Sequence, residues 1–258
     1  MLQADVIDQK EGLTMYYEQT FRVEGRDADP FNQCRPSSLL NLLQETAIRH
    51  AIELHVSRQE MMERYHCFWM MARLWYRLEK PVYWDDKLTV RTFHRGNKGI
   101  AMYRDFDLFR NGEPIGEAVS TWVLADLTDR KLLKLSQVAE VEGTTGGELC
   151  KSITLHKIRM PEELEPKENR LLHYSDCDVN GHVNNVRYAD FACDAVRLDK
   201  EGAGKFVSEL QISFLRECRP GEALALSAAR EADTWYVKGS DEEGAERFSV
   251  SLKLENLP

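Results

Sequence analysis

The sequence predicts an α+β protein made of two tandem halves, each with one long helix packed on an antiparallel sheet. Three observations lead to this prediction. A helix-spaced apolar segment is followed by several strand-like segments, and the same order returns in the second half of the chain. Residues 77–90 also resemble residues 215–226 once a two-residue gap is allowed, with an offset of roughly 140 residues. Together these features indicate a tandem duplication whose halves pack against each other like the subunits of a dimer.

The first half begins with a predicted helix over residues 36–55. Pro36 suits its first turn, and Leu39, Leu43 and Ala47 recur at helical spacing. Predicted strands follow at residues 68–80, 87–94, 100–110 and 114–126. Asn111-Gly112 is typical of the turn in a hairpin between the last two strands.

The second half repeats this plan after residues 142–170, which are rich in Gly, Pro and charge and are predicted to be a linker or an extended crossing segment. A helix is predicted over 184–199, and strands are predicted at 206–218, 222–231, 234–239 and 246–255. The predicted domains are therefore an N-terminal half over residues 1–141, the linker over 142–170 and a C-terminal half over 171–258.

Composition excludes several classes of function. The chain has 258 residues and a net charge of −9, which argues against non-specific binding to nucleic acid. Its six cysteines are widely spaced and form no C-x-x-C pair, so neither a structural metal site nor a disulfide framework is expected. We find no signal-peptide pattern at the start and no apolar run long enough to span a membrane. We therefore expect a cytoplasmic protein with reduced thiols, without a membrane span, a metal or an organic cofactor.

The most informative stretch is Y-S-D-C-D-V-N-G-H-V-N-N-V-R-Y at residues 174–188. If the segment is extended, Asp178, Asn180 and His182 are every second residue, and their side chains lie on the same side of the backbone. Asn184 or Asn185 is the expected N-cap of the following helix. The free N–H groups at the start of that helix would suit a carbonyl oxygen that gains negative charge during attack.

This motif resembles that of hotdog-fold thioesterases, and in particular that of the acyl-acyl carrier protein thioesterases of plants and bacteria. Three further stretches resemble the same family: L-L-N-L-L-Q-E-T-A-I-R-H-A (39–51), F-L-R-E-C-R-P-G-E-A-L (214–224) and S-T-W-V-L-A-D-L-T-D-R-K-L-L-K-L (120–135). The resemblance covers nearly the whole chain from about residue 16. It implies a double hotdog fold and the hydrolysis of acyl-acyl carrier protein thioesters to free fatty acids.

The resemblance implies catalytic roles for Asp178, Asn180, His182 and Glu217. In this interpretation Glu217 accepts a proton from the attacking water, Asn180 positions that water, and Asp178 holds His182 in one tautomer. A direct attack by Asp178, which gives an acyl-anhydride, is an alternative that the sequence leaves open.

Two other interpretations concern the cysteines. Cys218 matches a family position once assigned as a nucleophile. Since neighbours on a strand face opposite sides, Cys218 is expected to point away if Glu217 points into the site. A metal site formed by His173, Cys177, Asp178 and His182 is disfavoured by the loose spacing of its ligands.

The first half lacks an equivalent D-x-N-x-H string, and the resemblance implies that it shapes the acyl pocket instead. Helix 39–54 and strand 68–76, with Met61 and Met62, are candidates to line that pocket. Ordinary core packing is the alternative interpretation of the same residues.

The expected partner is an acyl carrier protein that carries an acyl chain, and a homodimer is compatible with the sequence. Because such carriers are acidic, two basic clusters are candidates for docking: Arg130, Lys131 and Lys134, and Lys151, Lys157 and Arg159. The alternative functions are an acyl-CoA thioesterase of the same fold, a non-catalytic acyl-binding protein and a dehydratase.

Overall fold

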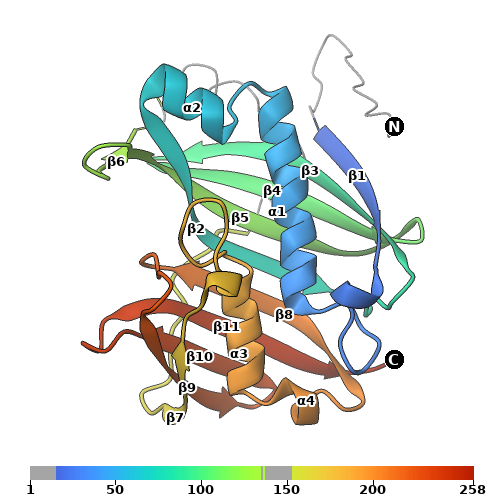
Figure 1. Cartoon of the computed structure of the whole chain (residues 1–258). Helices are drawn as coiled ribbons and strands as arrows, with labels where there is room; N and C mark the ends of the chain where they lie inside the picture. The colour runs from blue at the N-terminus through green and yellow to red at the C-terminus, as the bar shows by residue number, and fades with distance from the viewer. Residues whose placement is uncertain (1–15, 135, 137–152) are drawn as a thin grey trace. The chain divides into compact units, whose positions relative to one another are not determined.

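The computed structural model describes residues 16–134, 136 and 153–258 (Figure 1). The described residues belong to two compact units that interleave along the chain. The first unit takes the described parts of Met1–Arg22, Leu42–Leu74 and Asp86–Leu155, and the second takes Val23–Asn41, Trp75–Asp85 and His156–Pro258. The boundaries of the compact units therefore differ from those of the two sequence halves. The division of the sequence at residues 141 and 171 stays a prediction.

The first unit is an antiparallel sheet with helical segments beside it. Its strands pair in the order β1, β3, β4, β5, and a short strand β6 pairs with β5. The elements of this part of the chain are β1 (Tyr16–Arg22), α1 (Pro36–Glu53), α2 (Arg58–Tyr65), β2 (Cys67–Leu78), β3 (Lys87–Lys98), β4 (Ala101–Arg110), β5 (Glu113–Asp126) and β6 (Leu132–Leu133). The predicted helix and the predicted strands of the first half are confirmed to within a few residues, whereas β1, α2 and β6 were not predicted.

Helix α1 contacts the sheet of the first unit partly through buried polar groups. A guanidinium nitrogen of Arg104 on β4 donates to Nδ1 of His50 on α1 over 2.7 Å, and both residues are only 3% exposed. Burial and the neighbouring Arg104 lower the pKa of His50 to about 3. The imidazole is therefore neutral at physiological pH and can accept this bond.

Asp107, also on β4, is another buried charge in this unit. It pairs in register with Arg91 of β3 and Glu117 of β5, while Arg91 forms an ion pair with Glu18 over 2.8 Å. Burial raises the pKa of Asp107 to about 6, and the nearby Arg91 offsets only part of this effect. The folded state therefore disfavours the ionised form of Asp107, and this carboxylate lowers the stability of the protein at a pH where it is charged.

We expect the substitution Asp107→Asn to stabilise the protein at pH 8. The pKa of Asp107 is higher in the folded state than in the unfolded state, so its stabilising contribution is present below about pH 4 and is lost as pH rises through 6. The gain in the free energy of unfolding is expected to be on the order of 2 kcal/mol at pH 8 and close to zero at pH 4. Denaturant unfolding of both proteins at a series of pH values measures it. An equal difference at all pH values would contradict the prediction.

The strands of the second unit pair antiparallel in the order β8, β11, β10, β9, β7. Its elements include the 3₁₀ turns η1 (Gly25–Asp27) and η4 (Tyr174–Asp176), β7 (Glu165–Leu171), α3 (Arg187–Ala195), α4 (Leu198–Glu201), β8 (Lys205–Phe214), β9 (Ala223–Glu231), β10 (Thr234–Ser240) and β11 (Glu246–Asn256). Helix α3 buries Tyr188 against this sheet, where its ring centre lies 4.7 Å from that of Phe248 and 5.8 Å from that of Phe214. The α+β class with one helix on each sheet is confirmed.

Strand β7 overlaps the end of the segment predicted as a linker or an extended crossing segment, of which residues 142–152 fall outside the described residues. Two predicted boundaries in this unit are wrong. The predicted helix 184–199 is split into α3 and α4 because Arg197 adopts a left-handed conformation with φ of 56°. The predicted strand 206–218 ends at Phe214, so Glu217 and Cys218 lie in a loop. In the part of the chain that the structure describes, we find no helix with the length and apolar character needed to cross a membrane.

Candidate functional site

Two loops of the second unit meet at the candidate site. The first, residues 172–186, contains the Asp-Asn-His motif and is called the motif loop; the second, residues 215–222, is called the glutamate loop. The Val183 N–H donates to the Cys218 carbonyl over 2.8 Å, the Leu172 N–H donates to the Glu222 carbonyl over 2.9 Å, and the Gly221 N–H donates back to the Leu172 carbonyl over 2.8 Å. These backbone bonds fix the two loops side by side.

The motif loop is a tight turn rather than an extended segment. The Asp178 N–H donates to the His182 carbonyl over 3.1 Å, and the Gly181 N–H donates to the Asp178 carbonyl over 3.0 Å. Gly181 has a φ of +75°, a conformation that glycine adopts without strain. The expectation that strand alternation aligns Asp178, Asn180 and His182 is therefore wrong, and their proximity comes from the turn.

The structure brings His182 and Glu217 together. His182 Nε2 lies 3.9 Å from Glu217 Oε1, and the two side chains are 24% and 36% exposed. His182 Nδ1 lies 3.3 Å from the Val183 carbonyl, to which it can donate a proton. This contact favours the tautomer whose Nε2 is free to accept a proton on the side of Glu217.

Asp178 and Asn180 lie in the same turn but contact other groups than expected. The Asp178 carboxylate accepts the Asn180 backbone N–H over 2.8 Å, which stabilises the turn. Asn180 is exposed. Among the described residues no hydrogen bond joins the Asp178 carboxylate to His182, so a role for Asp178 in holding the imidazole stays a prediction.

The start of α3 has fewer free backbone N–H groups for a developing oxyanion than we predicted. Val186, rather than Asn184 or Asn185, is the N-cap. The Val186 N–H donates to the Asn184 side-chain oxygen, and the Arg187 N–H donates to the Asn184 carbonyl. Since the preceding loop occupies these N–H groups, they are not available to a substrate oxygen.

Arg247, a residue of β11 that holds the glutamate loop, was not predicted from the sequence. Its guanidinium donates to the Glu217 carbonyl over 2.9 Å, and its own carbonyl accepts the N–H groups of Leu215 and Arg216. Asp241 orients the Arg247 side chain through an ion pair of 3.0 Å. Arg247 lies on β11, 30 positions along the chain from Glu217, so no local spacing links the two residues.

Asp176 is a second residue that the sequence interpretation missed. It is 7% exposed and forms an ion pair with Arg187 over 3.1 Å, while its carboxylate also accepts the His173 N–H. Its carbonyl accepts the Asn184 N–H over 2.9 Å. Asp176 thereby ties the start of the motif loop to its end.

Cys218 points away from the pair formed by His182 and Glu217. It is fully buried and hydrogen-bonds with Tyr188 of α3. Burial raises the pKa of the Cys218 thiol, which lowers its thiolate fraction at neutral pH. Cys218 is thus fully buried while the Glu217 side chain is 36% exposed, although the strand alternation from which we predicted their opposite directions is absent.

We expect the substitution Cys218→Ala to retain most of the turnover that the wild type shows, because a buried thiol cannot reach a substrate. Alkylating reagents should inactivate the wild type slowly for the same reason. Thioester hydrolysis by the two proteins, followed with and without an alkylating reagent, measures both effects. A loss in Cys218→Ala as large as that in Glu217→Ala would instead favour a cysteine nucleophile.

A loop in the first half of the sequence, residues 24–35, repeats the backbone bonds of the motif loop. The Asp29 N–H donates to the Gln33 carbonyl over 2.8 Å, and the Asp29 carboxylate accepts the Phe31 N–H over 2.9 Å. Asn32 takes the place of Gly181 with a φ of 66°. The Cys34 N–H donates to the Val82 carbonyl, as the Val183 N–H does to the Cys218 carbonyl. These bonds place Asp29 at the position of Asp178, Phe31 at that of Asn180 and Gln33 at that of His182. Because Val82 corresponds to Cys218, the preceding residue Pro81 corresponds to Glu217.

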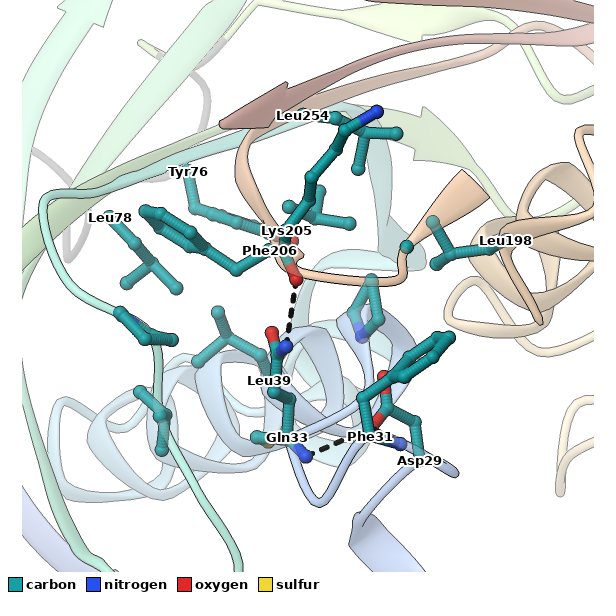
Figure 2. A pocket seen from close by; sticks show the side chains of 16 residues that line it. Asp29, Phe31, Gln33, Leu39, Tyr76, Leu78, Leu198, Lys205, Phe206 and Leu254 are labelled. Carbon is teal, nitrogen blue, oxygen red and sulfur yellow. Dashed lines mark hydrogen bonds between the residues drawn. The ribbon is translucent and has the colours of Figure 1, made fainter. Parts of the chain in front are cut away.

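This matching loop retains the aspartate but has no acid–base pair. Figure 2 shows that the Gln33 side chain is directed at the Lys205 carbonyl, to which it donates over 2.8 Å. Phe31 and Pro81 line the same small pocket, whose cavity volume of about 20 Å³ has room for roughly one water molecule. Gln33 and the apolar Phe31 and Pro81 thus occupy the positions that carry functional groups in the second loop.

A metal site does not emerge from the geometry. In residues 16–134, 136 and 153–258, no group of three or more His, Cys, Asp or Glu side chains lies close enough to hold a metal ion. Cys177, one of the candidate ligands, bridges to Val183 through its backbone and directs its thiol at the His173 carbonyl.

Comparison with known families covers both halves of the sequence. Residues 14–140 match the acyl-ACP thioesterase N-terminal domain, and residues 161–254 match the acyl-ACP thioesterase C-terminal domain. The order and extent of the two matches agree with the tandem arrangement inferred from the internal repeat.

Curated relatives are distant but similar over most of this chain. It is 24% identical to oleoyl-acyl carrier protein thioesterase 1 of Arabidopsis thaliana, over 96% of this chain and 72% of the relative. It is 23% identical to a dodecanoyl-[acyl-carrier-protein] hydrolase of Cinnamomum camphora, over 81% of this chain and 58% of the relative. The chain therefore spans only part of the length of these relatives.

Solved structures show the same fold. A crystal structure of an acyl-ACP thioesterase from Bacteroides thetaiotaomicron aligns with a TM-score of 0.84 at 21% identity, over 93% of this chain and 98% of the other. The 12:0-ACP thioesterase from Umbellularia californica aligns with a TM-score of 0.78 at 19% identity, over 95% of this chain and 100% of the other. The fold is thus the predicted double hotdog, and the chain belongs to the acyl-ACP thioesterase family.

Proposed function

We propose that this protein hydrolyses acyl-acyl carrier protein thioesters and releases free fatty acids. The observation that carries the proposal is the approach of His182 Nε2 to within 3.9 Å of Glu217 Oε1 at an accessible place between two loops. Family membership supports the substrate class, because the named relatives are acyl-[acyl-carrier-protein] hydrolases and thioesterases.

A distance of 3.9 Å is too long for a direct hydrogen bond, but it suits a water molecule bound by both side chains. In the proposed reaction Glu217 accepts a proton from this water, and the water oxygen attacks the thioester carbon. The carbon–sulfur bond then breaks, and the carrier leaves as a thiol or thiolate. Because Nδ1 of His182 is directed at the Val183 carbonyl, Nε2 is the nitrogen that exchanges protons with the reacting groups.

Asp178 admits two roles in this scheme. Its carboxylate either orders the turn that presents His182 or attacks the thioester carbon directly to give an anhydride that water then hydrolyses. Asn180, exposed at the tip of the turn, is proposed to contact the attacking water or the substrate.

The experiment that tests the function compares hydrolysis of one acyl chain on acyl carrier protein and on coenzyme A. Release of free fatty acid with a preference for the carrier-bound thioester supports the proposal. A preference for the CoA thioester would favour the acyl-CoA thioesterase instead, and hydrolysis of neither would favour a non-catalytic acyl-binding protein. The cytoplasmic location and the assembly as a homodimer stay predictions.

A further inference from the structure

The rim of the candidate site contains strongly exposed apolar side chains. Val179, at the tip of the motif loop between Asp178 and Asn180, is 97% exposed, and Tyr174, in the 3₁₀ turn of the same loop, is 92% exposed. Leu215 at the start of the glutamate loop is 43% exposed. Single exposed apolar residues are common, but three on two adjoining loops beside a reactive pair are typical of a contact surface.

The same rim contains two arginines that are exposed and not engaged in ion pairs. Arg216 and Arg219 bracket Glu217 and its neighbour in the sequence, and both are exposed. Within the described part of the chain, neither side chain lies within ion-pair distance of a carboxylate. Other arginines of the same unit differ, because carboxylates neutralise each of these: Arg170, Arg187, Arg197, Arg230 and Arg247.

Carboxylates on the two loops are directed at other groups. Asp176 binds Arg187 and the His173 N–H, Asp178 accepts the Asn180 N–H, and Glu222 accepts the Arg219 backbone N–H over 3.1 Å. Arg216 and Arg219 therefore present positive charge to solvent on a protein whose net charge is −9.

We propose that Tyr174, Val179, Arg216 and Arg219 form the surface on which the acidic carrier protein docks while its flexible arm delivers the thioester to His182 and Glu217. This inference rests on the proposed function, since it names the place where that substrate's protein part binds. A carrier with a negative surface is repelled at long range by a protein of net charge −9, so local arginines are needed to make the encounter productive. The exposed apolar side chains supply the contact area that charge alone does not.

The two basic clusters predicted from the sequence are weaker candidates, although Arg159 is exposed and, in the described part of the chain, lies within ion-pair distance of no carboxylate. Lys131 forms an ion pair with Asp129 over 2.6 Å, and Lys157 forms one with Glu246 over 3.1 Å. The guanidinium of Arg130 lies over the ring of Phe68. Lys151 lies outside the described residues.

Charge reversal tests the docking surface when carrier-bound and truncated substrates are compared. The variant Arg216→Glu/Arg219→Glu should lower kcat/KM for an acyl chain on purified acyl carrier protein at least about tenfold more than for the same chain on N-acetylcysteamine. The difference should shrink at high ionic strength because salt screens exposed charges. The matched control is Lys80→Glu/Lys200→Glu, which makes the same change in net charge at two exposed lysines on neither loop. A second variant, Tyr174→Ser, should shift the ratio in the same direction without a change in its salt dependence.

Each result decides between alternatives. An unchanged ratio in the arginine variant, or an equal shift in the lysine control, would overturn the docking surface and leave the proposed hydrolysis intact. A wild type that cleaves the truncated thioester but not the carrier-bound one would overturn both the docking surface and the proposed hydrolysis of carrier-bound thioesters. If the wild type cleaves neither substrate, both the docking surface and the proposed function are wrong.

Discussion

The substitutions Glu217→Gln and His182→Ala are each expected to lower turnover about 10²-fold or more, the scale on which acid–base groups contribute to catalysis. Glutamine keeps the size and polarity of Glu217 but cannot accept a proton, and alanine removes the imidazole altogether. KM should change less than kcat, because neither side chain is placed to hold most of the acyl chain. Steady-state hydrolysis of the preferred thioester measures both constants.

The double variant separates a joint role from two independent ones. Because His182 and Glu217 lie 3.9 Å apart and are proposed to act on one water, removing both should cost little more than removing either. Multiplicative losses would show that they act in separate steps. Circular dichroism and thermal unfolding serve as the folding control, and both should change little because backbone bonds hold the two loops together.

Asp178 offers a related comparison that resolves the open mechanism. Asp178→Ala removes the carboxylate that accepts the Asn180 N–H, so we expect a loss of about 10²-fold. The oxygen of asparagine can still accept that bond, so Asp178→Asn should retain much of the activity if the residue only orders the turn. Inactivity of Asp178→Asn with an intact fold would favour direct attack by the carboxylate. Near wild-type rates in both His182→Ala and Asp178→Ala would overturn the assignment of the site.

Hydrophobic periodicity predicted the longer elements of the first half well, but it missed the shorter elements β1 and α2. Helix α1 and strands β3, β4 and β5 were predicted because their apolar residues recur at the spacing that a one-sided core demands. Strand β7 carries the sequence E-P-K-E-N-R-L, is mostly exposed and pairs only with β9 among the described strands. An exposed edge strand has no apolar alternation, so it resembled a linker.

The residue types of the candidate site could be proposed from the sequence, but its geometry could not. His182 and Glu217 were both selected from the sequence, and they meet although they are far apart in the chain. The motif loop is fixed against the glutamate loop by backbone bonds, and the chain after Phe214 is held by the carbonyl of Arg247 on β11, which no local pattern reports. Arg247 holds Glu217 through its carbonyl, an interaction that is independent of the type of residue at position 217. Contacts of this kind leave no signal in a single sequence.

The predicted division of roles between the two halves leads to the second prediction with a large expected effect. The loop of the first half that matches the motif loop carries Gln33 and Phe31 where the motif loop carries His182 and Asn180, which leaves that half without an acid–base pair. If the first half takes no part in catalysis, it is free to bind the acyl chain. We predict that α1 and β2 line the acyl pocket. Ala47 on α1 is the most suitable position for a test because it is small and only 4% exposed.

We therefore expect Ala47→Phe to shift the preferred acyl length downward, whereas Ala195→Phe on α3, at an alanine that is 6% exposed, should not. A phenyl ring in the pocket excludes part of the chain, and each excluded methylene forfeits about 0.8 kcal/mol of burial. That energy corresponds to roughly a fourfold loss of preference per carbon, so a pocket shortened by two carbons changes the ratio of rates on two neighbouring even-numbered chains about fifteenfold. A series of carrier-bound thioesters of increasing length measures this ratio.

Both variants overpack a buried position at a cost of about 1–3 kcal/mol, so their stabilities should be similar and only the length profile should distinguish them. Short chains should still be hydrolysed by Ala47→Phe, because His182 and Glu217 are untouched. A length profile that shifts in Ala195→Phe and not in Ala47→Phe would place the acyl chain against α3 and reverse the predicted roles of the two halves.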